Sequence, residues 1–163
     1  MTKEIIQERL TQAFAGASLQ WAELWGMLEC TIPADQNLAI ATFLFQELGF
    51  RFLTDITGIH YPEQEGKELG IITHLHNLKD NIRLRLKAFV PVSTPDTHSL
   101  TSLFSGADWM ERETYDFYGI NFMGHPNLKR ILNVDEMDYF PMRKEYQMED
   151  PTRLDKDDEM FGR

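Results

Sequence analysis

The chain has 163 residues, a single cysteine and a formal net charge of −10. One thiol excludes an intrachain disulfide, a zinc site made of several cysteines and an iron–sulfur cluster held by this chain alone. The acidic balance argues against nucleic acid as a partner, because phosphate binding needs an excess of Lys and Arg. No uncharged run is long and apolar enough to span a bilayer, and no secretory signal begins the chain, so we expect a reducing compartment.

The N-terminal third predicts two helices and one strand. Apolar spacing favours a helix at Lys3–Ala15, and a strand is expected at Leu24–Ile32. A second helix is expected to begin at an Asp35 cap and to run to Leu48, with Gly49 just past its end. This second helix is apolar on nearly every side, which predicts that it lies beneath other elements.

Three strands are predicted next, at Phe50–Ile59, Leu69–Leu78 and Ile82–Val90. The short turn at 79–81 indicates a hairpin between the last two. In the last strand, apolar side chains alternate with polar ones, which is typical of an antiparallel strand with one buried face. Its polar side carries the basic row Arg83, Arg85 and Lys87. This row is either a solvated face or a docking surface for an acidic partner.

A third helix is predicted at Ala107–Tyr118, where Arg112 and Asp116 stand at the i,i+4 spacing of an ion pair and Gly119 ends the helix. After Gly124 the segment is polar, irregular and interrupted by prolines. The fold class is therefore α+β: a mainly antiparallel sheet of about four strands with helices packed on one face, followed by an extended irregular C-terminal segment.

Two units are expected along the chain. Residues 1–122 form the α+β core domain, and residues 123–163 form an extended C-terminal segment that binds partners. The portion after about Asp150 has few apolar residues, so we expect partners to order it.

The densest group of chemically capable residues is ERETYDFYGINFMGHPNLKRIL, from Glu111 to Leu132. Glu111 and Glu113 are two apart on a helix, roughly 200° around it, so they cannot face one substrate. We expect one carboxylate to be buried against Arg112 or a backbone amide and the other to be exposed. His125 lies in a Gly-His-Pro turn with no Ser or Cys nucleophile evident nearby, so no catalytic triad is indicated.

Histidines give the alternative of a metal site. His74 and His76 share one face of a predicted strand, and His60 and His125 are possible further ligands. The competing interpretation is an exposed strand face that carries two polar rings. A stand-alone metal-dependent enzyme using His74 and His76 is therefore a remote alternative.

The stretch from Glu111 to Leu132 resembles the signature of the 30 kDa (C-type) subunit of respiratory NADH:quinone oxidoreductase, complex I, in its unfused form. PMRKEY, at residues 141–146, resembles the second motif of that family, and the similarity extends over residues 35–147. One departure is the pair Tyr139-Phe140, where many relatives carry Gly-His. The motif residues, expected to serve the fold or a partner interface, are Glu111, Arg112, Glu113, Asp116, Gly119, Gly124, His125, Pro126, Arg130, Pro141, Arg143 and Lys144.

The resemblance implies a cofactor-free structural subunit in the peripheral arm of a proton-translocating complex, with no catalytic, cofactor-binding or metal-binding residues of its own. FMN, iron–sulfur clusters, NADH and quinone would be bound by neighbours. The implied partners are the 49 kDa (D-type) subunit and the iron–sulfur subunits of B and I type. The implied location is the cytoplasmic face of the bacterial inner membrane, without insertion.

Two further alternatives remain from the sequence. Related subunits occur in membrane-bound hydrogenases and in ferredoxin- or F420-linked oxidoreductases, so the electron donor is open. A free regulatory binding domain is the other.

Overall fold

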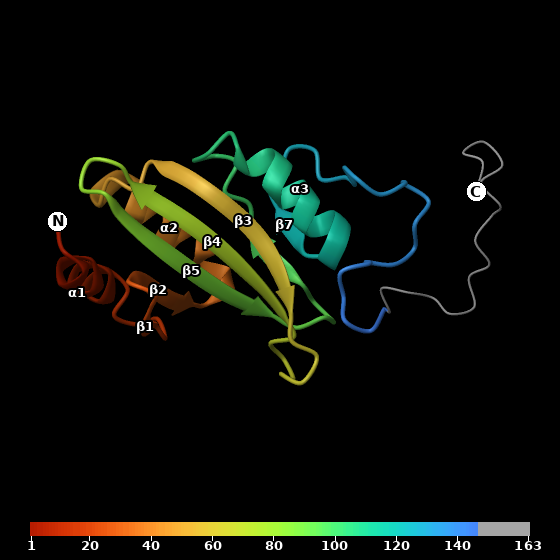
Figure 1. The fold of residues 1–163 in the computed structure, drawn as a ribbon, viewed down its shortest axis with the longest axis horizontal. Helices are drawn as coiled ribbons and strands as arrows, with labels where there is room; N and C mark the ends of the chain where they lie inside the picture. Colours follow the sequence, from red (N-terminus) through yellow and green to blue (C-terminus); the bar gives the residue numbers. More distant parts are fainter. Residues whose placement is uncertain (147–163) are drawn as a thin grey trace, which may run out of the picture.

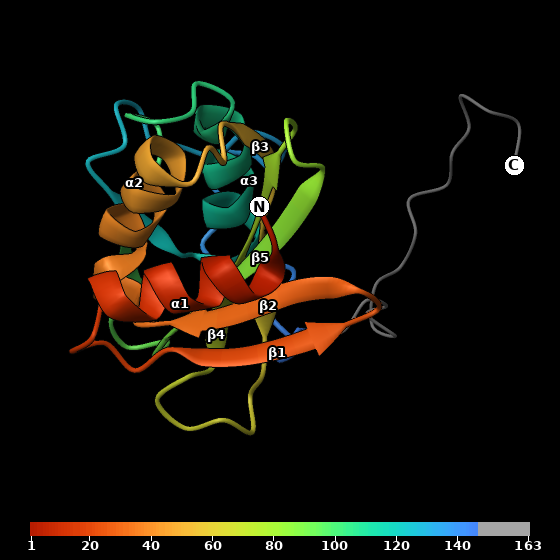
Figure 2. The same ribbon diagram turned by 90° about the vertical axis from the view of Figure 1, so that its left-hand side faces the viewer.

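The computed structural model of the chain describes residues 1–146. Within them, a five-stranded sheet in the order β1-β2-β5-β4-β3 carries the α-helices on one face (Figures 1 and 2). The elements, in chain order, are α1 (Lys3–Ala13), β1 (Gln20–Leu24), β2 (Met27–Ile32), the 3-10 helix η1 (Ala34–Gln36), α2 (Asn37–Glu47), β3 (Phe52–His60), β4 (Leu69–Asn77), β5 (Ile82–Val90), β6 (Asp96–His98), α3 (Ala107–Tyr118) and β7 (Asn121–Met123). The predicted α+β class is confirmed.

Strands β3, β4 and β5 form an antiparallel meander, and the predicted β4–β5 hairpin is confirmed. β5 has the predicted bounds, and its alternation is seen in burial: Leu84, Leu86, Ala88 and Val90 are buried on the helix side. Successive side chains of a strand point to opposite faces of the sheet, so apolar residues at every second position share one face. That face is the one that the helices bury.

The single strand predicted at Leu24–Ile32 is wrong. The chain reverses at Trp25 and Gly26, so Leu24 ends β1 and Met27 begins β2. Both turn residues have positive φ, 55° and 76°, as a two-residue hairpin turn of type I′ requires. β2 then pairs with β5 in parallel, so the sheet has five strands and is mixed.

The helices close the core over the sheet. α2 begins at Asn37 after η1, and Gln36 precedes it without a side-chain capping bond, so the predicted Asp35 cap is wrong. Gly49, with φ of 70°, follows the end of α2 as predicted. Most of the large, fully buried apolar side chains come from α1, α2 and the inner sheet face, and they include Ile6, Leu10, Ile40, Leu44, Leu75, Leu84 and Leu86.

Helix α3, which has the predicted bounds, packs against the edge strand β3. Gly58 of β3 makes this approach possible, because a Cβ at that position would collide with the ring of Tyr118. A short parallel pair, β6 with β7, brackets α3 in sequence. None of the helices in residues 1–146 is long and apolar enough to cross a membrane.

Candidate functional site

Helix α3 divides the charged residues of the Glu111–Leu132 stretch between two environments. Glu111 and Asp116 are fully buried and Arg112 is nearly so, whereas Glu113 is exposed. The expected separation of the two glutamates is therefore confirmed, and the buried one lies against a backbone amide.

Glu111 joins α3 to the loop that precedes it. The backbone N–H of Leu100 donates to its Oε1 at 2.6 Å, and the hydroxyl of Ser99 donates to its Oε2 at 2.7 Å. Burial raises the pKa of Glu111, and these two hydrogen bonds offset that effect only in part. The carboxyl group is used to fix the 99–101 turn.

Asp116 organises the chain that follows β7. Its Oδ1 accepts from Arg130 at 2.7 Å and from the side-chain amide of Asn133 at 3.0 Å. Its Oδ2 accepts from the backbone N–H groups of Ile131, Leu132 and Asn133 at 3.1, 2.8 and 2.9 Å. Burial by itself would raise the pKa of Asp116, but the donors outweigh it and hold the pKa well below its usual range.

The predicted Arg112–Asp116 ion pair is wrong, because each residue has a partner from the later segment. Arg112 donates through Nε to the carbonyl of Lys129 at 3.2 Å and through Nη2 to that of Arg130 at 3.1 Å. Its guanidinium also lies over the ring of Trp109, 5.2 Å from the centroid. Arg112 and Asp116 thus hold the same loop from two positions on α3.

Gly119 allows the C-terminal segment to approach the end of α3. Its φ of 75° closes the helix, and a Cβ there would collide with Phe140 and Arg143. Arg143 donates to the Tyr118 carbonyl at 2.8 Å. The Phe140 ring lies beneath two guanidinium groups, with that of Arg130 at 5.1 Å and that of Arg143 at 4.7 Å. Within the departure Tyr139-Phe140, Phe140 therefore supplies an aromatic contact to both arginines, and the ring of Tyr139 lies against that of Tyr146.

The Gly124-His125-Pro126 turn is a structural corner. Gly124 has φ of 84°, and Pro126 is exposed. The His125 side chain is fully buried, with Nδ1 accepting from the Asn127 N–H at 3.0 Å. Nε2 therefore carries the proton and donates to the Asp108 carbonyl at 3.1 Å. Both ring nitrogens are occupied, which leaves neither available as a general base.

The second motif returns to the sheet. Pro141 is partly buried, and Lys144 donates its backbone N–H to Nδ1 of His60, the last residue of β3, at 2.9 Å. The Lys144 ammonium lies 5.9 Å from the centroid of the Tyr61 ring. Residues 141–146 are thus held at the end of β3.

The four histidines proposed as metal ligands are not brought together. His74 accepts from Arg85 at 2.9 Å and lies 3.7 Å from Asp55 of the neighbouring strand, while His76 contacts Asn81 at 3.3 Å. Burial and the adjacent Arg85 lower the pKa of His74. His60 and His125 have the separate roles described above, and no group of three potential ligands occurs within residues 1–146.

The basic row on β5 meets a carboxylate that strand prediction did not place beside it. Glu29 of β2 is almost fully buried and binds Lys87 at 2.6 Å and Arg85 at 3.2 Å. Burial tends to raise the pKa of Glu29, but the two cations reverse the effect and lower it. Arg83 remains outside this cluster. Only the unexpected parallel β2–β5 pairing creates the contact.

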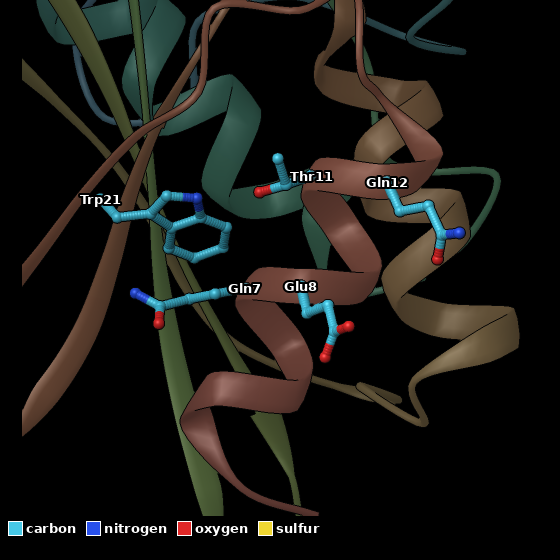
Figure 3. A pocket seen from close by; sticks show the side chains of 5 residues that line it. All are labelled: Gln7, Glu8, Thr11, Gln12 and Trp21. Atoms are coloured by element: carbon cyan, nitrogen blue, oxygen red, sulfur yellow. The ribbon is translucent and has the colours of Figure 1, made fainter.

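A cavity of about 610 Å³ opens between α1 and β1, away from the α3 site (Figure 3). It is lined by Gln7, Glu8, Thr11, Gln12 and Trp21. Glu8 is its only titratable side chain among the described residues. An acid–base pair or a metal site would need more groups of that kind.

The buried charges of the α3 site, Glu111, Arg112 and Asp116, are satisfied by backbone and side-chain groups of this chain. They hold the irregular segment against α3 and β3, and that segment presents apolar side chains outward. The large apolar side chains of that segment that are more than a third exposed are Leu132, Val134, Tyr139, Met142 and Tyr146; Trp109 of α3 and Met123 of β7 are exposed as well. These side chains are candidate contacts for another protein, because exposed apolar side chains are common at protein-binding surfaces.

Comparison with known proteins gives consistent results. Residues 30–152 match the model of the family described as "Respiratory-chain NADH dehydrogenase, 30 Kd subunit". The chain is 36% identical over 145 residues to the C-type subunit of NADH-quinone oxidoreductase from Citrifermentans bemidjiense, with 89% of each chain covered. It is 38% identical to the corresponding subunit from Xanthobacter autotrophicus, covering 92% of this chain and 72% of that one. A solved structure of the trypsin-resistant fragment (1-134) of Nqo5 superposes with a TM-score of 0.66 at 29% identity, over 78% of this chain and 100% of that one.

Proposed function

The chain belongs to the family of the 30 kDa subunit of respiratory-chain NADH dehydrogenase, and from this premise we propose that its α3 site is a docking element and not a catalytic one. The protein is a peripheral-arm subunit of an NADH:quinone oxidoreductase. The catalytic contribution of the complex is then made by other subunits, and this chain positions them.

The observation that carries the proposal is the saturation of Asp116. Five donors occupy its two oxygens, and all of them belong to Arg130 and residues 131–133 of the docked segment. A carboxylate with this many donors is a poor base, because protonation would forfeit several hydrogen bonds. The Asp116 carboxylate instead holds residues 130–133 in a fixed loop, and the outer side of that loop is apolar.

That outer side supports a protein partner. Leu132 and Val134 are about two-thirds exposed, and Met142 is half exposed. Leaving them in water is unfavourable by roughly 25 cal/mol per Å² of apolar surface, which burial against a partner would recover. We propose the 49 kDa subunit as the main partner of this surface, with the iron–sulfur subunits of B and I type nearby.

The remaining details of the proposal follow from the resemblance and the single thiol. Cys30 is buried, burial raises its pKa to about 12, and no group of three potential metal ligands occurs within residues 1–146, so we propose that this thiol holds no cluster or metal. FMN and the iron–sulfur clusters are held by neighbours, and the chain lies on the cytoplasmic face. We also propose the division into a core, residues 1–122, and a docking segment, residues 123–163. The trypsin-resistant Nqo5 fragment supports a separable core. The part after Asp150 lies outside the described residues.

The test uses a tagged chain expressed in place of the native protein. Leu132→Asp places a charge in the proposed interface, where burial without a partner is costly. The amount of 49 kDa subunit recovered per tagged chain from solubilised membranes should fall at least about tenfold, while the melting temperature of the free chain stays the same. Turnover per assembled complex should remain near normal.

A matched control is Leu78→Asp, because Leu78 is equally exposed, at 64%, but lies in the β4–β5 turn. It should leave recovery of the 49 kDa subunit unchanged. Metal and flavin analysis of the purified chain adds an independent check. Stoichiometric iron, zinc or flavin, or full assembly of the Leu132→Asp variant with lost turnover, would refute the docking role.

A further inference from the structure

The tip of the β1–β2 hairpin carries a tryptophan that contacts little of its own chain. Trp25 is 94% exposed, the highest value among the large apolar side chains in residues 1–146. It is also one of two non-glycine residues there with positive φ, at 55°. Exposure and backbone strain coincide in one bulky residue.

This combination is not explained by stability. A type I′ turn needs positive φ at both central positions and favours Asn, Asp or Gly, whose side chains tolerate it. A large aromatic side chain in this region is strained, and strain of this kind gathers at functional sites. No buried contact of Trp25 compensates, since the indole is almost wholly in solvent.

The tip is held in place and borders a groove. Lys3 of α1 donates to the Gly26 carbonyl at 2.7 Å and binds Glu23 at 2.7 Å, which ties the turn to the helix. Beside it lies a hollow of about 490 Å³, whose lining includes Trp25, Met27, Ile82 and the cations Lys3, Arg83 and Arg85.

The groove is basic although the chain carries a net charge of −10. Lys3 and Arg85 have the carboxylates Glu23 and Glu29, respectively. Arg83 forms no ion pair with any residue from 1 to 146, so its guanidinium is the cation of the groove that can pair with an anion from another molecule. A carboxylate from another molecule complements this position.

The hairpin lies away from the docking segment. β1 is one edge of the sheet, and β3, against which α3 packs, is the other. Figure 1 shows the hairpin and the segment after β7 on opposite sides of the meander. The matched family region begins at residue 30, after the tip. This surface is therefore distinct from the α3 site.

We propose that Trp25 and the adjoining groove bind an acidic segment of a second neighbouring protein of the complex, with the indole in an apolar pocket and a carboxylate on Arg83. This rests on the proposed function, which places the chain in a complex of several subunits. Tryptophan and arginine are the residue types most often found as interface hot spots. A protein is favoured over an anionic membrane, because Arg83 is the single cation of the groove left unpaired within residues 1–146 and suits one carboxylate, whereas anionic lipid surfaces attract clusters of several Lys and Arg residues.

The first experiment identifies the occupant. The photoreactive residue p-benzoylphenylalanine is placed at position 25 of the tagged chain in the assembled complex, and cross-linked peptides are sequenced. The expected product is one Asp- or Glu-rich peptide from another protein of the complex. Cross-links only to lipid, only to a second copy of this chain, or to nothing would overturn the inference.

The second experiment uses Trp25→Asn, which removes the anchor and suits the turn. The melting temperature of the free chain should stay the same or rise, while retention of the cross-linked partner falls at least tenfold. Arg83→Glu leaves the Trp25-Gly26 turn intact and should also lower retention of the cross-linked partner. The result therefore does not depend on whether Trp25→Asn folds normally. Unchanged retention in both variants would overturn the inference. Recovery of the 49 kDa subunit distinguishes failure of this inference from failure of the proposed function. If the wild-type chain recovers that subunit, the proposed function stands even when the inference about Trp25 fails.

Discussion

Replacing Asp116 with alanine should be among the most destabilising single changes in the described chain. The side chain is fully buried, and Asp116→Ala removes the acceptor of five donors. Arg130 keeps the carbonyls of Met137, Tyr139 and residue 116 itself, at 2.7, 3.0 and 2.9 Å, but loses its carboxylate.

The magnitude follows from the broken pair. Removing one partner of a buried ion pair costs about 3 to 5 kcal/mol. Each unsatisfied donor can add about 1 to 3 kcal/mol, but the 131–133 amides lie near the surface and can turn to water, so these values do not sum. We therefore expect a loss of about 3 to 5 kcal/mol, which lowers the melting temperature by roughly 6 to 20 °C for a chain of this size.

Urea unfolding of the purified chain, followed by circular dichroism, measures the effect. Asp138→Ala is the control, because Asp138 is exposed in the same segment and should change stability by no more than about 0.5 kcal/mol. Tryptic cleavage after Arg130 should also be faster in the Asp116 variant. Equal stability of the two variants would refute the view that Asp116 fixes the segment.

Acid titration gives a second signature of the same group. The folded-state pKa of Asp116 is lowered, so its stabilisation is complete above the unfolded-state pKa of about 3.9. As pH falls through the folded-state pKa, that stabilisation is lost. Wild type and Asp116→Ala should therefore converge in stability below about pH 4, and a constant difference would contradict the assignment.

Three further outcomes are expected. The stability of Glu111→Gln should rise relative to that of wild type as pH increases from about 4.3 towards neutrality. The reason is that the folded-state pKa of Glu111 is raised, so wild-type stability falls over that range. Urea unfolding midpoints at several pH values test this. Gly119→Ala should destabilise by at least about 1 to 2 kcal/mol and speed tryptic cleavage at Arg143, since both φ and space oppose a Cβ. Glu113→Gln, at an exposed site, should spare the free chain but reduce assembled complex in native gels, with near-normal turnover; full assembly with a hundredfold loss of turnover would identify an active site instead.

Local patterns predicted the parts of the fold that depend on local spacing. The alternation in Ile82–Val90 and the apolar stripe of Ala107–Tyr118 gave the bounds of β5 and α3. The β1–β2 hairpin was missed because its turn has Trp25 where Asn or Gly is usual, so Leu24–Ile32 looked continuous. The parallel pairing of β2 with β5 was missed because an alternating sequence indicates which face of a strand is buried, but it does not indicate which strand lies beside it.

The candidate site follows the same division. Helical spacing correctly separated Glu111 from Glu113, but it also suggested Arg112 as the partner of Asp116. The actual partner, Arg130, is fourteen residues away in an irregular segment, where no period predicts contact. Similarly, Asp55 lies opposite His74 only through the β3–β4 register.

The parallel pairing of β2 with β5 also bears on the order in which the protein forms. Leu28 pairs with Leu84, so this part of the sheet joins segments that are distant in sequence, whereas β3, β4 and β5 are consecutive. Contacts between distant segments close later, because a long loop must first be ordered. During synthesis the N-terminal hairpin emerges first but has no sheet to join until β5 has left the ribosome. We therefore expect the β2 strand, which holds the buried Glu29, to join the sheet after β3, β4 and β5 have paired, and its unpaired edge is exposed to misassociation in the meantime.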